Sequence, residues 1–291
     1  MPPPERIPSR SMSAADEVIV LTGSEVPPVP SVLTVLGKGE LTVRGRIREA
    51  SNAALFCVAE YEGRQVTCVY KPVAGERPLW DFPDGNLARR ELAAYELSET
   101  TGWGLIPPTV LRDGPYGEGM CQLWIEADAE AAPLLSLVEA DEPGAGWKAI
   151  AFAEVGEGRT ALLVHADDDR LRRMAVLDAV INNGDRKGGH LLPAVGGRLY
   201  GIDHGVSFNV EDKLRTLLWG WAGEPLTPEA VEVLGRLDSA LAEGAPLATR
   251  LAELITVAEL DAVRERVAEL RTTGRHREPS GQWPSIPWPP V

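Results

Sequence analysis

Cysteine and long apolar runs are scarce in this chain. Its 291 residues include only three cysteines, Cys57, Cys68 and Cys121, and none of them stands in a C-x-x-C spacing. That usage excludes a disulfide framework or a zinc site, favours small buried roles for the thiols, and suits a reducing compartment. No stretch approaches the roughly 18 apolar residues of a membrane span, and the Pro-rich N-terminus has no apolar signal-peptide core. We expect a cytoplasmic protein with no stable membrane anchor.

Basic residues are fewer than acidic residues in this chain. The chain has 29 Lys and Arg against 43 Asp and Glu, a formal net charge of −14 at pH 7. A negative protein field repels polyanions, which argues against non-specific binding to nucleic acid or anionic lipid, so no nucleic acid partner is expected. Apolar residues make up 44% of the chain, enough to bury a core in one large domain or in two lobes that share a cleft.

The first half of the chain predicts an antiparallel sheet. Three β-like runs follow one another at 41–47, 54–61 and 65–71, and Glu62-Gly63 makes the second turn. Two further strands are expected at 109–112 and 120–126, separated by a glycine-containing turn.

One amphipathic helix interrupts these strands. It is expected from Leu87 to Thr101 and ends at Gly102. The apolar and small residues of this run fall on one face, which leaves the charged residues at 89–91 on other faces.

The second half predicts mostly helix. After an Ala-, Glu- and Pro-rich segment at 127–146 the pattern becomes helical, and the aspartates at 167–169 cap a helix that runs through Ile181 and stops at Asn183-Gly184. Residues 198–208 predict a strand and a loop, and two or three helices are expected within 228–271. A β-rich part followed by a mostly helical part indicates an α+β fold with a cleft between two lobes.

Four segments follow from these patterns: a disordered N-terminus at 1–15, a β-rich N-lobe at 16–126, a helical C-lobe at 127–271 and a Pro/Trp-rich strap at 272–291. Residues 1–15 mix Pro, Ser and charges without an apolar period. In the strap Trp283 and Trp288 alternate with prolines. Because an exposed Trp is unfavourable, an extended strap laid on the body is favoured over a free tail.

Polar side chains are densest in the run from Asn182 to His190 and in the later run Gly201-Ile202-Asp203-His204-Gly205. In phosphoryl transfer an Asp accepts the proton of the attacking hydroxyl, a metal ligand follows five residues later, and a later Asp shortly before Gly bridges the metal to the phosphates. Asp185, His190 and Asp203 fall at those spacings. The chain is therefore predicted to be an ATP-dependent phosphotransferase.

These two runs also resemble a known family. Asp185-Arg186-Lys187 with a ligand at 190, followed by Ile202-Asp203-His204-Gly205, is similar to the catalytic and metal-binding loops of the phosphatidylinositol 3- and 4-kinase superfamily. The resemblance is greatest to the type II phosphatidylinositol 4-kinases and the bacterial kinase-like proteins grouped with them. It spans about residues 40 to 235 and includes weaker matches at 90–94, 106–109 and 219–222. It implies a two-lobed protein-kinase-like fold and the use of ATP with Mg²⁺ or Mn²⁺.

The resemblance assigns nucleotide-binding roles in the N-lobe. Lys71 would bind the α- and β-phosphates, and Glu91 would orient it as an ion pair. The loop at 48–52 would cover the phosphates, with Ser51 and Asn52 as donors. The strand at 121–126 would run into the hinge between the lobes, and backbone groups near Leu123 and Ile125 would face the adenine.

The resemblance also assigns the transfer site. Asp185 would be the base or hydroxyl-orienting group, and Lys187 would neutralise charge on the transferred phosphate. His190 and Asp203 would hold the divalent metal, and Asp178 and Asn183 would brace the loop. His190 replaces the family's usual Asn, and its softer nitrogen should favour Mn²⁺ over Mg²⁺. His204 stands at the usual Phe position, where local packing or hydrogen bonding is expected.

The acceptor stays open among a protein Ser/Thr hydroxyl, a small polyol and a phosphoinositide, and transfer of a nucleotidyl group is a further alternative. Type II lipid kinases carry a cysteine-rich acylated anchor, and this chain has no such cluster. A second hypothesis is a nucleotide-binding pseudokinase that regulates a partner protein through the strap and an acidic surface.

Overall fold

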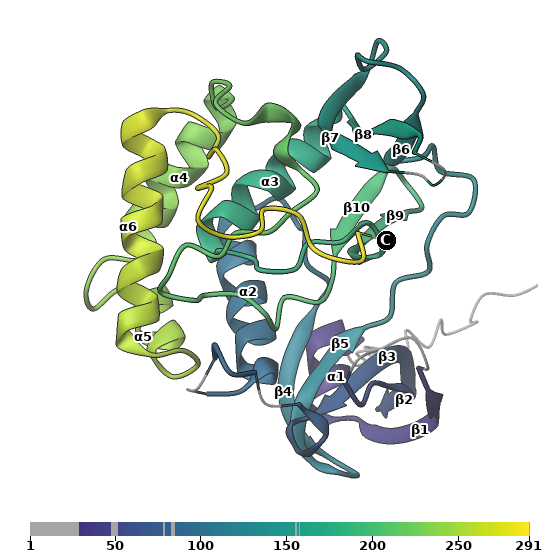
Figure 1. Ribbon diagram of the computed structural model, residues 1–291. Coiled ribbons are helices and arrows are strands. Elements are labelled where there is room, and N and C mark those ends of the chain that lie inside the picture. The colour runs from purple at the N-terminus through teal and green to yellow at the C-terminus, as the bar shows by residue number, and fades with distance from the viewer. Residues whose placement is uncertain are drawn as a thin grey trace, which may run out of the picture.

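The computed structural model describes residues 29–47, 52–77, 79–82, 85–154, 156 and 158–290 (Figure 1). The disorder expected at 1–15 and the phosphate contact expected from Ser51 both lie outside the described residues.

The N-lobe is a five-stranded antiparallel sheet with the order β1-β2-β3-β5-β4. Its first three strands form the predicted meander, and Glu62 and Gly63 both have positive φ at the turn between β2 and β3. β5 ends at Leu123 rather than at Glu126, where its paired register with β3 stops. The strands are β1 (Glu40–Arg46), β2 (Leu55–Tyr61), β3 (Arg64–Pro72), β4 (Thr109–Gly114) and β5 (Gly117–Leu123).

One face of this sheet packs against the short helix α1 (Val32–Lys38). The core between them contains all three cysteines, each fully buried and free, together with Val35, Leu36 and Tyr70. The cysteines therefore act as small apolar residues, as the sequence predicted.

Helix α2 (Leu87–Thr101) has the predicted bounds. The side chain of Asn86 caps it by accepting the Arg89 N–H at 2.8 Å, and Gly102 ends it in the left-handed region at φ 74. The predicted orientation of its charged run is wrong for Arg90 and Glu91, which are each only 2% exposed. Both are buried because each has an oppositely charged partner, Glu259 for Arg90 and Lys71 for Glu91.

A three-stranded antiparallel sheet occupies residues 135–166, where the sequence suggested helix from about 147 onward. Its order is β6-β8-β7. The alternation in β7 is hard to read because alanines take up many of its positions and the strand is only half-buried. The strands are β6 (Leu135–Val138), β7 (Trp147–Glu154) and β8 (Thr160–Ala166).

The remaining helices of the C-lobe follow the prediction, whereas a strand at 191–194 was not predicted. Asp168 caps α3 (Asp169–Ile181), which ends at Asn182 with φ 52, just before the expected Asn183-Gly184. A hairpin of β9 (Leu191–Ala194) and β10 (Arg198–Gly201) then precedes three helices that share one large apolar core with α2 and α3. These are α4 (Pro228–Ala240), α5 (Pro246–Ala252) and α6 (Val257–Thr273), and short 3₁₀ turns lie at η1 (Val73–Gly75), η2 (Gly188–His190) and η3 (Trp219–Trp221).

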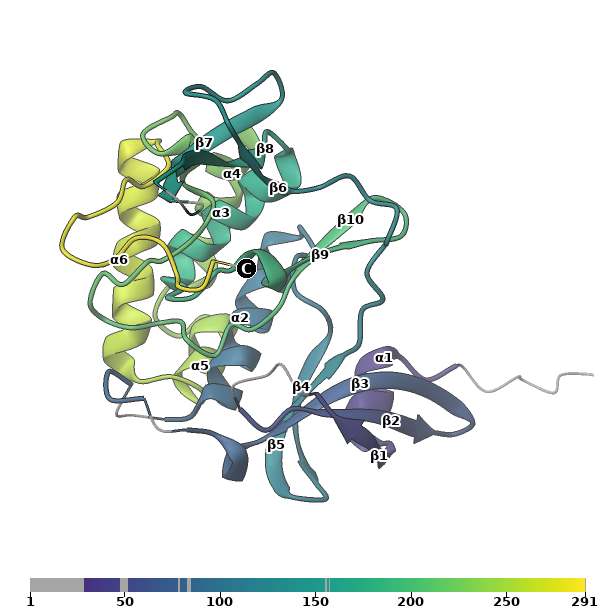
Figure 2. The same ribbon diagram turned by 45° about the vertical axis from the view of Figure 1, so that its right-hand side comes forward.

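The elements separate into a β-rich lobe and a mostly helical lobe (Figures 1 and 2). The five-stranded sheet lies at one end and the small sheet β6-β8-β7 at the other, while α4, α5 and α6 lie along one side of the molecule. Helix α2 contacts strands β4 and β5 as well as α4, so it joins the lobes. The α+β two-lobed class predicted from the sequence is confirmed.

Candidate active site

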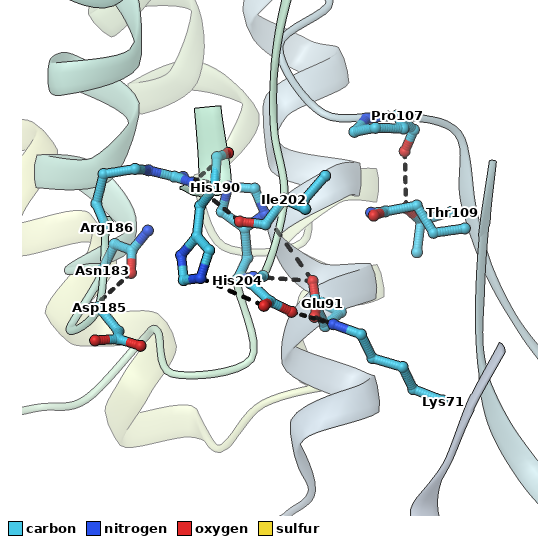
Figure 3. Close-up of polar contacts among 12 residues, drawn as sticks. Lys71, Glu91, Pro107, Thr109, Asn183, Asp185, Arg186, His190, Ile202 and His204 are labelled. Atoms are coloured by element: carbon cyan, nitrogen blue, oxygen red, sulfur yellow. Dashed lines mark hydrogen bonds and ion pairs between the residues drawn. The ribbon is translucent and has the colours of Figure 1, made fainter. Parts of the chain in front are cut away.

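Lys71 lies near the end of β3 and meets carboxylates from two other segments. Its Nζ is 2.9 Å from Glu91 Oε1 on α2, and it also pairs with Asp203 Oδ1 on the loop after β10 (Figure 3). The ion pair expected between Lys71 and Glu91 is therefore present. These contacts bring strand β3, helix α2 and the predicted metal loop to one point between the lobes.

Glu91 joins these segments through both of its oxygens. While Oε1 accepts from Lys71, Oε2 accepts the backbone N–H of His204 at 2.9 Å. The side chain of Glu91 is almost fully buried. A buried carboxylate with two charge-assisted or backbone donors is held in one orientation, so Glu91 sets the position of Lys71 relative to the loop.

The charges of Lys71 and Asp203 stabilise each other. The positive charge of Lys71 holds the pKa of Asp203 well below its ordinary value, which outweighs the opposing effect of burial. Burial alone would lower the pKa of Lys71, but the carboxylates of Asp203 and Glu91 together raise it above its ordinary value. Both groups are therefore charged at neutral pH. Asp203 also has a φ of 60, a left-handed conformation of the kind that clusters at functional sites.

His190 faces the same aspartate. Its Nε2 is 3.4 Å from Asp203 Oδ2, and its buried Nδ1 has no hydrogen-bond partner among the described residues. Burial lowers the pKa of His190, which outweighs the raising effect of Asp203 and is reinforced by Arg186. A neutral imidazole beside an ionised carboxylate is a donor set that fits a divalent cation.

The described residues contain no group of three or more His, Cys, Asp or Glu side chains that could hold a metal. His190 and Asp203 would thus be two protein ligands, with the remaining positions left to phosphate oxygens and water. Mg²⁺ sites that work with nucleotides are commonly built this way, from one or two protein ligands plus the substrate phosphates.

Asp185 lies on the loop after α3, separated from Lys71 by the ring of His190 in the view of Figure 3. Its Oδ2 is 3.1 Å from Lys187 Nζ, and its backbone N–H donates to Asn183 Oδ1 at 3.0 Å. Asn183 in turn donates to Asp178 Oδ1 at 2.9 Å. Asp178 and Asn183 are fully buried, so the carboxylate of Asp185 projects from a braced loop and is itself partly exposed.

Sequence reasoning missed the role of Arg186. Its side chain is fully buried and donates to both oxygens of Asp178 at 2.9 Å, to the Ile202 carbonyl at 3.0 Å, and contacts His204 Nε2 at 2.6 Å. Burial lowers the pKa of His204 well below its ordinary value, and the positive charge of Arg186 lowers it further. The Nε2 of His204 can therefore accept a hydrogen bond from the guanidinium. Arg186 thus ties the loop of Asp185 to the loop of Asp203. An arginine next to a candidate catalytic aspartate was the available signal, but its burial was not readable from the sequence.

The backbone amides assigned to the adenine differ in their hydrogen bonding. The Leu123 N–H donates to the Pro108 carbonyl at 2.9 Å, and the Trp124 N–H donates to the Thr67 carbonyl at 3.0 Å. Neither amide is free for a nucleotide base, whereas the Ile125 N–H has no partner among the described residues. Asn52 contacts a neighbouring loop, where its Oδ1 accepts the Arg77 N–H at 3.0 Å.

Side chains of β2, β3 and β5 surround an open pocket near the predicted hinge. Side chains at 67, 69 and 71 share one face of β3, because successive residues of a strand alternate between faces. The shallow, open pocket, of about 370 Å³, lies on β2, β3 and the end of β5, and its lining includes Thr67, its cross-strand partner Val58, and Leu123. Phe56 and Trp124 stand edge to face nearby, with ring centroids 5.1 Å apart.

The fold is similar to that of solved kinase structures. The structure of the Golgi casein kinase with Mn/ADP bound matches with a TM-score of 0.51 and 15% identity, over 83% of this chain and 74% of the other. Hydra Fam20 with sugar matches with a TM-score of 0.50 and 14% identity, over 83% of this chain and 86% of the other. At these identities the similarity establishes the fold alone, and the finer prediction of a phosphatidylinositol kinase is not confirmed.

The chain belongs to the family of the Mycobacterium tuberculosis protein Rv2133c. The two sequences are 50% identical over 263 residues, and the match covers 88% of this chain and 94% of the mycobacterial protein. No family model matches the chain. Among the described residues no helix is long and apolar enough to cross a membrane.

Proposed function

We propose that this protein is an ATP-dependent kinase that transfers the γ-phosphate of ATP to a hydroxyl group. The observation that carries the proposal is the convergence of Lys71, Glu91 and Asp203 at one point between the lobes. A lysine on the sheet, a glutamate on the following helix and an aspartate on a later loop are the parts that kinases use to hold ATP phosphates and their metal ions.

The residues divide into a nucleotide side and an acceptor side. On the nucleotide side, Lys71 binds phosphate oxygens and Glu91 keeps it in place. Asp203 and His190 would hold Mg²⁺ or Mn²⁺, which neutralises negative charge on the phosphates when bound. The pocket beside Thr67 and Val58 accepts the base, with the Ile125 backbone as its donor.

On the acceptor side, Asp185 orients the hydroxyl and takes its proton. The bond from the acceptor oxygen to the γ-phosphorus forms as the bond from that phosphorus to the β–γ bridging oxygen breaks, so the products are ADP and a phosphate ester. Lys187, whose Nζ is 3.1 Å from Asp185 Oδ2, is placed to neutralise charge on the transferred group. Positioning and electrostatics supply most of the catalysis in this chemistry.

The test is transfer of label from γ-labelled ATP into a cell extract separated into protein, lipid and small-molecule fractions, with Mn²⁺ and with Mg²⁺. Asp185→Asn and Asp203→Ala should each lose label at least about a hundredfold. Asp141→Asn, which changes an exposed aspartate between β6 and β7, is the matched control and should keep the label. The labelled fraction identifies the class of acceptor. Tight ATP binding without label in any fraction would contradict the proposal and favour a nucleotide-binding regulator.

A further inference from the structure

The segment after α6 is anchored along its whole length. Helix α6 ends at Thr273 and is capped by Gly274, so the part of the predicted strap that follows the cap is residues 275–290, which we call the C-terminal strap. Near its start, Arg277 pairs with Asp212 at 3.0 Å, and further on the ring of Trp283 lies 4.7 Å from Lys213 Nζ. Ile286 packs against the C-lobe core. In both ribbon views the strap crosses the C-lobe and ends beside the loop that carries η2 (Figures 1 and 2).

The second half of the strap uses its carbonyl groups to bind the segment 215–219. The Ser285 carbonyl accepts the Thr216 N–H at 3.0 Å and the Trp219 indole N–H at 2.8 Å. At the end of the strap, the Pro290 carbonyl accepts the Gly188 N–H at 2.9 Å. Gly188 directly follows Lys187, so the strap reaches the loop of Asp185 itself.

The segment 215–216 is also bound to the loop of Asp185. The Arg186 N–H donates to the Arg215 carbonyl at 2.9 Å, and the Arg215 N–H donates to the Asn183 carbonyl at 2.9 Å. Three stretches of backbone therefore lie side by side in the order 183–188, 215–216 and 285–290. The strap is the outermost of the three, and its last residues fold back onto Gly188.

In one recurring mode, an extended polypeptide binds a protein surface through main-chain hydrogen bonds to unpaired backbone groups. Beside Asp185 the N–H groups of Gly188 and Thr216 would be the natural donors, and the strap already occupies both. We infer that the strap is a built-in wall of the acceptor site, which excludes extended polypeptides and restricts the acceptor to a compact hydroxyl compound. This inference rests on the proposed kinase function, because it names the class of acceptor for that site.

The strap is a resident wall rather than a lid, because its anchors are spread from Arg277 to Pro290. A substitution that releases it should therefore act on a central anchor. Ile286→Asp places a carboxylate against the C-lobe core and should detach the second half of the strap. Trp288→Asp introduces the same charge two residues later, at a position where the side chain is 82% exposed, and it is the matched control. Trp283→Ala combined with Ile286→Asp is the second releasing variant.

The first experiment measures hydrogen exchange at the Gly188 and Thr216 amides and does not depend on catalysis. Both amides should be protected in the wild type and in Trp288→Asp, and should exchange at least about tenfold faster in the two releasing variants. The same samples are titrated with fluorescein-labelled, dephosphorylated casein as an unstructured polypeptide. Only the releasing variants should bind it.

The second experiment measures label transfer from γ-labelled ATP to dephosphorylated casein, to myo-inositol and to water. The wild type should leave casein unlabelled, and the releasing variants should label it. The inferred role of the strap would be overturned if the wild type bound or labelled casein as well as Ile286→Asp does. Fast exchange of the Gly188 amide in the wild type would overturn it too. Absence of transfer to every acceptor, water included, would instead overturn the kinase proposal, while exchange and casein binding still decide the role of the strap.

Discussion

The charges around Lys71 are unbalanced before a nucleotide binds. Lys71 pairs with two carboxylates, Glu91 and Asp203, and burial lowers the pKa of His190 beside them. The group therefore has an excess of negative charge, which opposes the entry of a polyphosphate. A divalent cation bound with the nucleotide would reverse that balance, so we expect nucleotide binding to depend strongly on metal.

The identity of the residue at 190 should set the preferred metal. With imidazole nitrogen and carboxylate oxygen as ligands, the wild type should be more active with Mn²⁺ than with Mg²⁺. His190→Asn replaces the nitrogen with an amide oxygen and should shift the Mn²⁺ to Mg²⁺ activity ratio towards Mg²⁺ by about tenfold. Parallel metal titrations of the two proteins measure this ratio. A wild type that prefers Mg²⁺ would rule out His190 as a ligand.

Arg186 should be a major contributor to stability. Arg186→Met leaves the buried carboxylate of Asp178 without its cation, which should lower the free energy of unfolding by about 3–5 kcal/mol. Asp178→Leu combined with Arg186→Met removes both charges, so the double variant should lose less free energy of unfolding than the single variant. Urea denaturation gives these values. A loss below about 1 kcal/mol for the single variant would show that the pair contributes little.

At the scale of elements, the strap begins with a short ladder against the segment after η3. The His276 N–H donates to the Glu224 carbonyl at 2.9 Å, and the Gly223 N–H donates to the His276 carbonyl at 3.2 Å. The ring of His276 stacks on Trp221, and its Nε2 accepts from Arg172 Nε at 3.2 Å. The imidazole must be neutral to accept that bond, so the contact between α3 and the strap depends on pH.

Burial, together with the positive charge of Arg172, lowers the pKa of His276 from 6.5 to about 4. Between these values the unfolded chain binds a proton that the folded protein does not, so stability is lost as pH falls from about 6.5 to about 4. The loss from pH 7 to pH 5 should be on the order of 2 kcal/mol from this group. Urea unfolding at both pH values checks it, and His276→Gln should show a correspondingly smaller difference. An equal difference in the two proteins would remove His276 as the cause.

At the scale of the whole molecule, the site is assembled from both lobes. Lys71 and Glu91 belong to the sheet and α2, whereas Asp203 and Arg186 belong to loops of the C-lobe. A ligand that contacts both sides favours the folded state over the unfolded state by mass action. The Arg90–Glu259 pair also joins α2 to α6, so a nucleotide would add to an existing connection between the lobes.

ATP with Mn²⁺ should therefore raise the melting temperature of the protein. A ligand at a hundredfold excess over its dissociation constant adds about 2.7 kcal/mol, which corresponds to several degrees in a chain of this size. Asp203→Ala should lose most of this stabilisation, because the metal would lose its carboxylate, while Asp141→Asn should keep it. Differential scanning calorimetry with and without metal measures the shift. An equal shift in Asp203→Ala would place the nucleotide elsewhere.

Local elements were predictable from the sequence where their signals are local. The bounds of α2 and the start of α3 follow from the residues that cap them, Asn86 with Gly102 and Asp168. The meander was readable from β-branched runs and the turn at Glu62-Gly63. The strands at 135–166 were not, because alanines hide the alternation and the pairing partners lie in neighbouring segments.

The sequence by itself determined which residues are chemically able to form the site, since the spacing of Asp185, His190 and Asp203 is a property of the chain. Tertiary structure alone decided that Lys71 and Glu91 meet Asp203, that Arg186 is buried between two loops, and that the strap ends on Gly188. These are contacts between residues far apart in the chain, and their free energies depend on burial and on oppositely charged partners. Burial and the pairing of opposite charges are set only when the two lobes pack, so neither can be read from the sequence alone.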